Sequence, residues 1–141
     1  MTDAEIQNTL ALADTRLGRA YLLGAKWALA DKDPQGPIDC SGFSRWVLWQ
    51  AGIVVPDGSY NQIKVCTKIP ASIQKTPPPL CLGFYEGSGG AVDHVVIARD
   101  DVNVIEARGV PYNAVINRPI AKWLAQPGFL GFYAPPGISY A

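Results

Sequence analysis

The sequence predicts one α+β domain, with helices from the front of the chain packed on a central antiparallel sheet built from its second half. Two helical patterns lie in the first 52 residues, and four apolar extended runs follow residue 79, joined by turns rich in glycine, proline and aspartate. Helices and strands that occupy separate parts of a chain are typical of this class. A length of 141 residues suits a single hydrophobic core, so residues 1–141 are expected to form one domain, with a linker that could begin at about residue 134.

The composition narrows the range of partners. Twelve Lys and Arg residues balance twelve Asp and Glu residues, and no long basic run occurs. We therefore expect binding neither to nucleic acid nor to a membrane surface through bulk charge. No apolar run approaches the roughly 18 residues of a transmembrane helix. The polar, acidic start of the chain does not have the pattern of a signal peptide, so we expect a protein made in the cytoplasm.

The first element in chain order is an amphipathic helix predicted over residues 2–18. Thr2 can cap it, and Glu5 stands at the spacing of a capping box. Gly18 is the expected end. The apolar stripe that gives the helix its packing face consists of Ile6, Leu10, Ala13 and Leu17.

A second helix is predicted directly behind Cys40, within the stretch 36–52. Its buried face would carry Phe43, Trp46, Val47 and Gln50. Asp39 or Ser41 can cap the first turn, and Gly52 is placed to end the helix. Cys40 would then lie at a helix N-terminus, where partial positive charge stabilises a thiolate. The alternative is a small buried residue, but the polar neighbours of Cys40 favour an attacking cysteine.

The rest of the chain is predicted to form loops and then strands. Residues 53–79 are rich in proline and predict long loops with short extended pieces, which often form the walls of a cleft. Strands are predicted over residues 80–85, 93–98, 102–107 and 129–133, with a short helix over residues 120–124.

The three cysteines, Cys40, Cys66 and Cys81, form an odd set without a C-x-x-C pair. A disulfide framework is therefore not expected, and a single histidine leaves irregular spacing for a zinc site. We expect Cys66 and Cys81 to pack in strands or loops, and we expect no metal and no cofactor.

His94 is the only histidine of the chain. A lone histidine near a strand start is more often structural, but a neutral imidazole is also the natural base for a thiol. Glu106 is the candidate to orient the ring. With an odd turn at residues 99–101, His94 would directly oppose Glu106 on one face of a hairpin. A two-residue turn at residues 100–101 would pair His94 with Ala107 and leave Glu106 on the other face, as a solvated carboxylate.

Two motifs together resemble the NlpC/P60 family of papain-like cysteine peptidases, which cut bacterial cell-wall peptides. They are Asp39-Cys-Ser-Gly-Phe43 ahead of a helix, and His94-Val-Val-Ile97 with a polar residue twelve positions after the histidine. Weaker similarities are Tyr21-Leu-Leu-Gly24, the proline-led strand at 79–84 and the closing helix and strand at 120–132. The similarity covers about residues 18–133. The sequence departs from the family at Glu106, where His, Asn, Asp or Gln is usual.

The resemblance implies amide hydrolysis through a thioester. Cys40 would attack the carbonyl carbon, His94 would activate the thiol and then protonate the leaving amine, and Glu106 would be the third catalytic residue. The backbone N–H of Cys40 would help to bind the oxyanion. In the family, the cleaved bond usually joins γ-D-glutamate to diaminopimelate or lysine.

The resemblance also implies substrate-binding roles for three residues near the cysteine. Tyr21 would stand beside it, while Asp39 and Ser41 would accept a free peptide amine. Core packing of Tyr21, and helix capping by Asp39 and Ser41, are the alternatives.

The expected partners are the stem peptides of peptidoglycan, with action at the bacterial cell wall. A lone catalytic domain suits a phage lysin or a tail-associated hydrolase, freed by phage machinery or lysis, which could contact phage tail proteins or belong to a longer endolysin. An injected amidase effector would look similar. Two other classes stay open: a cysteine amidase or acyltransferase with a non-wall substrate, and a non-catalytic binding domain of the same fold.

Overall fold

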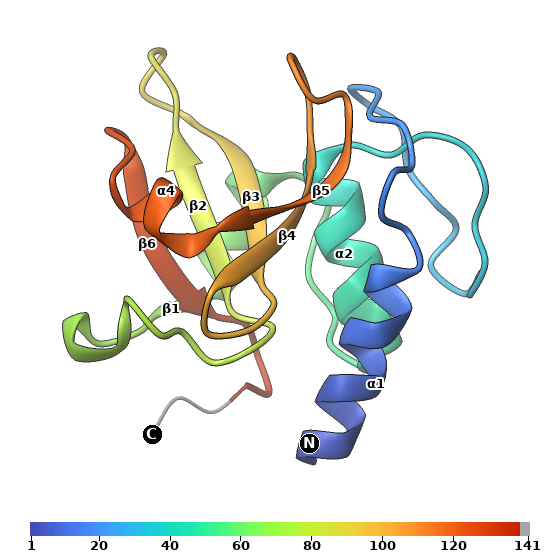
Figure 1. Cartoon of the computed structure of the whole chain (residues 1–141), viewed down its shortest axis with the longest axis horizontal. Helices are drawn as coiled ribbons and strands as arrows, with labels where there is room; N and C mark the ends of the chain where they lie inside the picture. Colours follow the sequence, from blue (N-terminus) through green and yellow to red (C-terminus); the bar gives the residue numbers. More distant parts are fainter. Residues whose placement is uncertain (139–141) are drawn as a thin grey trace.

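The computed structural model describes residues 1–138, which form a layer of helices beside a six-stranded antiparallel sheet. In Figure 1 the helices α1 (Asp3–Asp14) and α2 (Cys40–Gln50) lie together on one side of the molecule, and the curved sheet lies on the other. This is the predicted α+β arrangement. None of the helices in residues 1–138 has the length and apolar character needed to cross a membrane.

The sheet has the strand order β1-β6-β2-β3-β4-β5. Its strands are β1 (Thr67–Lys68), β2 (Leu82–Glu86), β3 (Val92–Ala98), β4 (Asn103–Arg108), β5 (Ala114–Pro119) and β6 (Phe129–Ala134). The four predicted strands are confirmed, with ends that differ by one or two residues. The sequence pattern missed β5, and β1 is one of the short extended pieces expected within residues 53–79, where no position was predicted for it. Strand β5 was missed because Asn117 and Pro119 weaken its strand signal. In the structure, β5 is stabilised by its pairing with β4, its one neighbour in the sheet.

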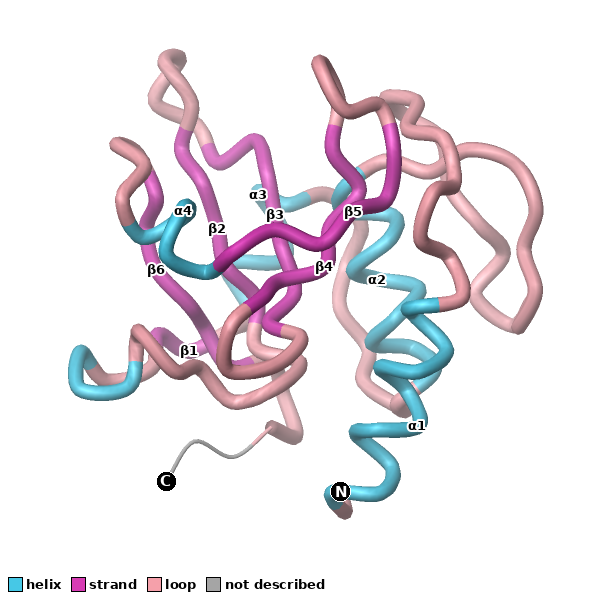
Figure 2. Tube along the Cα trace, in the orientation of Figure 1, coloured by secondary structure: helices cyan, strands magenta, loops and turns pink. Residues whose placement is uncertain are grey.

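Short helical pieces occupy part of the segment that was predicted as loops. Helix α3 (Ser59–Gln62) follows α2 in the chain, and Figure 2 shows it next to β3. Two 3-10 turns follow, η1 (Ile63–Val65) and η2 (Ala71–Ile73). The predicted short helix at residues 120–124 is confirmed as α4 (Ile120–Leu124).

Helix α1 begins as predicted but ends early. Thr2 Oγ1 accepts from the N–H of Glu5 at 3.1 Å, and Glu5 Oε1 accepts from the N–H of Thr2 at 3.3 Å, so the capping box is present. The helix stops at Asp14, and Leu17 is 40% exposed instead of buried. The buried Arg16 guanidinium explains the change, because the turn after the helix lets it donate to the carbonyl of Pro34 at 2.7 Å.

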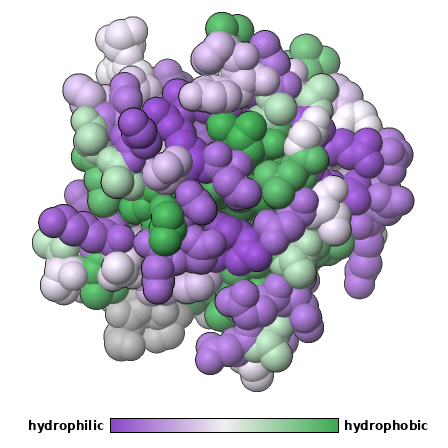
Figure 3. All heavy atoms as spheres, in the orientation of Figure 1, coloured by the Kyte–Doolittle hydropathy of each residue, from purple (hydrophilic) through white to green (hydrophobic). Residues whose placement is uncertain are grey.

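The core lies between α2 and the sheet. Helix α2 lies against β3 and β4 and contributes Phe43, Trp46 and Val47, which are almost completely buried. The rings of Phe43 and Trp46 pack edge-on against Trp27, from the loop before α2. Figure 3 shows hydrophobic side chains at the centre of one face, surrounded by hydrophilic ones. After β6 the chain turns at Pro135, and Ile138 is 9% exposed within the core cluster. The remainder of the predicted linker, residues 139–141, lies outside the described residues.

Candidate active site

Cys40 is the first residue of α2, and Asp39 is its N-cap. Asp39 Oδ1 accepts from the N–H of Gly42 at 2.7 Å, so of the two predicted caps it is Asp39 that closes the first turn. A Cβ on Gly42 would lie only 2.8 Å from this oxygen, so any larger residue at position 42 would clash with the capping carboxylate. Cys40 is 8% exposed, among the unpaired N–H groups and the positive end of the helix dipole.

His94 of β3 and Glu106 of β4 meet through their side chains. His94 Nε2 lies 2.9 Å from Glu106 Oε1, and the indole Nε1–H of Trp123 donates to Glu106 Oε2 at 2.6 Å. The Trp123 ring also stacks on the His94 ring, with centroids 5.3 Å apart. The side chain of Glu106 is 0% exposed, so the alternative of a solvated strand carboxylate is wrong.

The strand register that brings them together differs from both predicted registers. Ala98 pairs with Val104, and Ile97 with Ile105, so the connecting loop is longer than either predicted turn. Asp100 Oδ1 accepts from the N–H groups of Val102 and Asn103, which stabilises the longer loop. Compared with the predicted three-residue turn, the pairing of β3 with β4 is shifted by two residues. A shift of two residues keeps Glu106 on the same face of the sheet as His94, where it is a diagonal neighbour instead of a directly opposed one.

The electrostatics of this site centre on the His94 ring. Burial disfavours the charged ring, but the neighbouring Cys40 and Glu106 outweigh this effect and raise the pKa of His94 to about 9. Because Nε2 is engaged by Glu106, Nδ1 is the nitrogen available to Cys40. A protonated His94 beside Cys40 stabilises the thiolate, which is the attacking form of cysteine.

The other two cysteines have different surroundings. All three cysteines of the described chain are free. Burial raises the pKa of Cys66 to about 12, and burial together with the nearby Cys66 raises the pKa of Cys81 to about 12. Both thiols therefore stay protonated at neutral pH, which makes them poor nucleophiles.

Tyr21 stands beside the cysteine. Burial and the negative charges of Cys40 and Asp39 raise the pKa of Tyr21 above its ordinary value. The backbone of Tyr21 is fixed by its N–H, which donates to the carbonyl of Asn113 at 2.9 Å. Its ring rests on Gly109, where an added Cβ would lie 3.3 Å away. Tyr21 is partly buried and packs against the core cluster, and its substrate-binding role stays a prediction.

Asp39 and Ser41 are joined by a residue that sequence reasoning missed. The Lys26 ammonium lies 2.7 Å from each oxygen of Asp39 and 3.1 Å from Ser41 Oγ. It also pairs with Asp57 at 2.8 Å. Lys26 is thirteen residues upstream of Asp39, and no local pattern marks it. The substrate-binding role of Asp39 and Ser41 stays a prediction.

A small open pocket of about 140 Å³ adjoins the His94 ring. It is lined by Tyr85, Asp93, His94, Arg108 and Trp123. The Arg108 guanidinium lies on the face of Trp123 at 4.8 Å. Arg108, at the end of β4, and Trp123, in α4, were missed as site residues, because only the tertiary fold brings them to His94. Residues 1–138 hold no group of three or more His, Cys, Asp or Glu side chains arranged to bind a metal ion.

Sequence comparison agrees with this geometry. The profile of the NlpC/P60 family matches residues 18–130, a range that includes Cys40, His94 and Glu106. The chain belongs to the NlpC/P60 family. The probable endopeptidase p60 of Listeria monocytogenes is 32% identical over 119 residues, which cover 82% of this chain and 22% of that protein. The NlpC/P60 domain described here thus spans about a fifth of the length of that curated relative.

Solved structures show the same fold. An NLP/P60 family protein from Staphylococcus aureus, described as similar to a lipoprotein, superposes with a TM-score of 0.75 at 22% identity, over 96% of this chain and 42% of that one. The NlpC/P60 domain of the peptidoglycan hydrolase SagA superposes with a TM-score of 0.65 at 27% identity, over 95% of this chain and 98% of that domain.

Proposed function

We propose that this NlpC/P60 domain is a cysteine peptidase that hydrolyses amide bonds in the stem peptides of peptidoglycan. The observation that carries the proposal is the arrangement of Cys40, at the positive end of a helix, next to a histidine that a buried glutamate orients. The substrate class is supported by relatives described as a probable endopeptidase and as a peptidoglycan hydrolase.

The residues support a two-step reaction. The thiolate of Cys40 attacks the scissile carbonyl carbon, and a thioester forms as the C–N bond breaks. The proton held on His94 Nδ1 passes to the leaving amine. Water, deprotonated by the now neutral His94, then attacks the thioester and releases the acid and the Cys40 thiolate, with His94 protonated again. The N–H of Cys40 at the helix start is placed to stabilise the oxyanion in both steps.

Finer parts of the proposal rest on the family resemblance. They are cleavage between γ-D-glutamate and diaminopimelate or lysine, action at the bacterial cell wall, and a role as a phage lysin or tail-associated hydrolase.

Digestion of purified peptidoglycan tests the proposal. Wild type, Cys40→Ala and Cys66→Ala would be incubated with walls of lysine and diaminopimelate type, and the soluble products analysed by mass spectrometry. We expect wild type and Cys66→Ala to release peptide fragments whose masses identify the bond, and Cys40→Ala to release none. Absence of release by wild type from every wall type would refute the peptidoglycan substrate and favour a non-wall amide substrate or a binding domain.

A further inference from the structure

The acidic groups that flank the nucleophile already hold a cation supplied by the chain itself. The Lys26 ammonium contacts both carboxylate oxygens of Asp39, the hydroxyl of Ser41 and a carboxylate oxygen of Asp57, all within 3.1 Å. Asp39 and Ser41 are the residues directly before and after Cys40. The Lys26 ammonium therefore binds both sequence neighbours of Cys40.

Lys26 is held firmly in this position. The side chain of Asp39 is 7% exposed, so its charge needs a partner. A Cβ on Gly42 would lie 2.9 Å from Lys26 Cδ, which shows that the lysine stem packs against the first turn of α2. The ion pairs with Asp39 and Asp57 raise the pKa of Lys26 despite the opposing effect of burial. Lys26 thus stays charged at any pH at which the domain would work.

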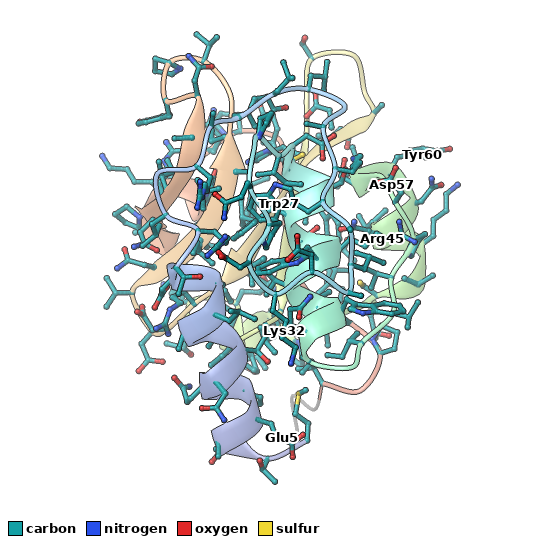
Figure 4. The ribbon with its side chains drawn as sticks, turned by 90° about the vertical axis from the view of Figure 1, so that its right-hand side faces the viewer. Glu5, Trp27, Lys32, Arg45, Asp57 and Tyr60 are labelled. Atoms are coloured by element: carbon teal, nitrogen blue, oxygen red, sulfur yellow. The ribbon has the colours of Figure 1, made fainter. Side chains whose placement is uncertain are left out.

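The charges around the site leave little attraction for a second cation. Asp57 also feels the charge of Arg45 on α2, and Figure 4 shows both side chains on the same side of this helix. Asp39 and Asp57 thus both pair with Lys26, and Asp57 is further balanced by Arg45. A substrate ammonium would have to displace Lys26 or lie against it, and like charges in contact are unfavourable. About a third of the Lys26 side chain is exposed, so a substrate carbonyl oxygen could accept a hydrogen bond from it.

We propose that Lys26 determines specificity: the site takes stem peptides whose amino end is acylated, as where the stem is joined to the glycan, and discriminates against stems with a free amino end. This inference rests on the proposed peptidase function. Under it, Asp39 and Ser41 hold Lys26 in place of a peptide amine.

The test compares one stem tetrapeptide, L-Ala-γ-D-Glu-L-Lys-D-Ala, with its N-acetyl form, and repeats the pair with diaminopimelate in place of lysine. Wild type is expected to show a kcat/KM at least about tenfold higher for the acetylated peptide, mainly through KM. Lys26→Met should abolish or reverse the preference, while Lys26→Arg and the exposed control Lys32→Met should keep it. Equal or faster cleavage of the free-amine peptide by wild type, or an unchanged ratio in folded Lys26→Met, would overturn the inference and leave the peptidase proposal intact.

Binding separates the two proposals if no hydrolysis is seen. Calorimetric titration of the Cys40→Ala variant with each peptide needs neither turnover nor a change at Lys26, so it decides the inference even if Lys26→Met fails to fold. Tighter binding of the acetylated peptide would support the role of Lys26 even if the peptidase proposal failed. Equal or weaker binding of that peptide would refute it.

Discussion

At the residue scale, the unusual feature is a glutamate that has no contact with water. Glu106 receives one hydrogen bond from Trp123, pairs with His94, and has Arg108 Nη1 3.6 Å from Oε1. The two cationic partners stabilise a carboxylate that would otherwise be costly to bury. Glu106, where this chain departs from the usual family pattern, therefore makes specific contacts within the candidate site. The hydrogen bond from Trp123 fixes which of its oxygens faces the histidine.

Glu106→Gln should disable the histidine without removing it. Trp123 donates to the far oxygen, so the glutamine carbonyl must face Trp123 and its NH₂ must face His94. Nε2 then has to accept, so the ring cannot carry a proton on both nitrogens, and the protonated His94 that stabilises the Cys40 thiolate is lost. We expect kcat/KM to fall by about 100-fold or more. Kinetics on stem peptides would measure it, with the exposed Glu5→Gln as control.

The same variant changes the pH dependence. His94 must be protonated to serve the leaving amine, so wild-type activity should be lost as the pH rises through the His94 pKa of about 9. Removing the Glu106 charge lowers this pKa, so the alkaline limb of kcat/KM should move to lower pH. A limb that stays in place in Glu106→Gln would show that Glu106 does not tune the histidine.

At the element scale, hydrogen bonds from Gln62 of α3 stabilise the first turn of α2. Gln62 is completely buried; its Nε2–H donates to the carbonyl of Ser41 at 2.9 Å, and its Oε1 accepts from Ser44 Oγ at 2.6 Å. These bonds anchor the turn that carries Cys40. The buried amide of Gln62 thus links α3 to the turn that carries Cys40.

Gln62→Leu should therefore destabilise the domain. It leaves Ser44 without its acceptor in Gln62 and removes one donor to Ser41, which costs about 1–3 kcal/mol of unfolding free energy. Urea unfolding monitored by circular dichroism would measure this loss. The exposed Gln7→Leu on α1 is the matched control and should change stability by less than about 0.5 kcal/mol. Equal stability of the two variants would show that the Gln62 bonds contribute nothing net.

At this scale, features set by neighbouring residues could be predicted from the sequence, whereas features set by residues distant in the chain could not. The Thr2 cap and the helix behind Cys40 are local patterns, and both are confirmed. The end of α1 was wrong because Arg16 is anchored by the distant Pro34. The register of β3 and β4 was wrong because Asp100 stabilises a longer loop. Lys26 could not be predicted, since only the fold brings it to Asp39.

At the scale of the whole molecule, the last described residues close the edge where α1 begins. Ile138 belongs to the core cluster, and it lines a cavity together with Met1 and Ile6 from the start of the chain and Pro78 and Pro79 from the loop before β2. Figure 1 shows the start of α1 and the end of the described chain at the same edge of the fold. The segment after β6 thus joins the two layers, and the cavity that it lines contains none of the candidate site residues.

Ile138→Ala should weaken this junction and spare the chemistry. Truncating a nearly buried isoleucine removes about 2–4 kcal/mol of unfolding free energy. The kcat/KM at low temperature should stay close to wild type, because Ile138 is not among the residues that line the site. Thermal unfolding and stem-peptide kinetics would test both statements, with Val110→Ala, 85% exposed in wild type, as control. A stability equal to that control would contradict the packing role.

The central claim is that Cys40 is an activated nucleophile paired with His94. The rate of iodoacetamide alkylation at each cysteine, followed by peptide mass spectrometry between pH 5 and pH 10, tests it most directly. We expect Cys40 to react selectively near pH 6 to 7, Cys66 and Cys81 to stay unmodified there because their pKa values are raised to about 12, and His94→Ala to remove the selectivity. Uniform labelling, or selectivity that persists in His94→Ala, would contradict the account.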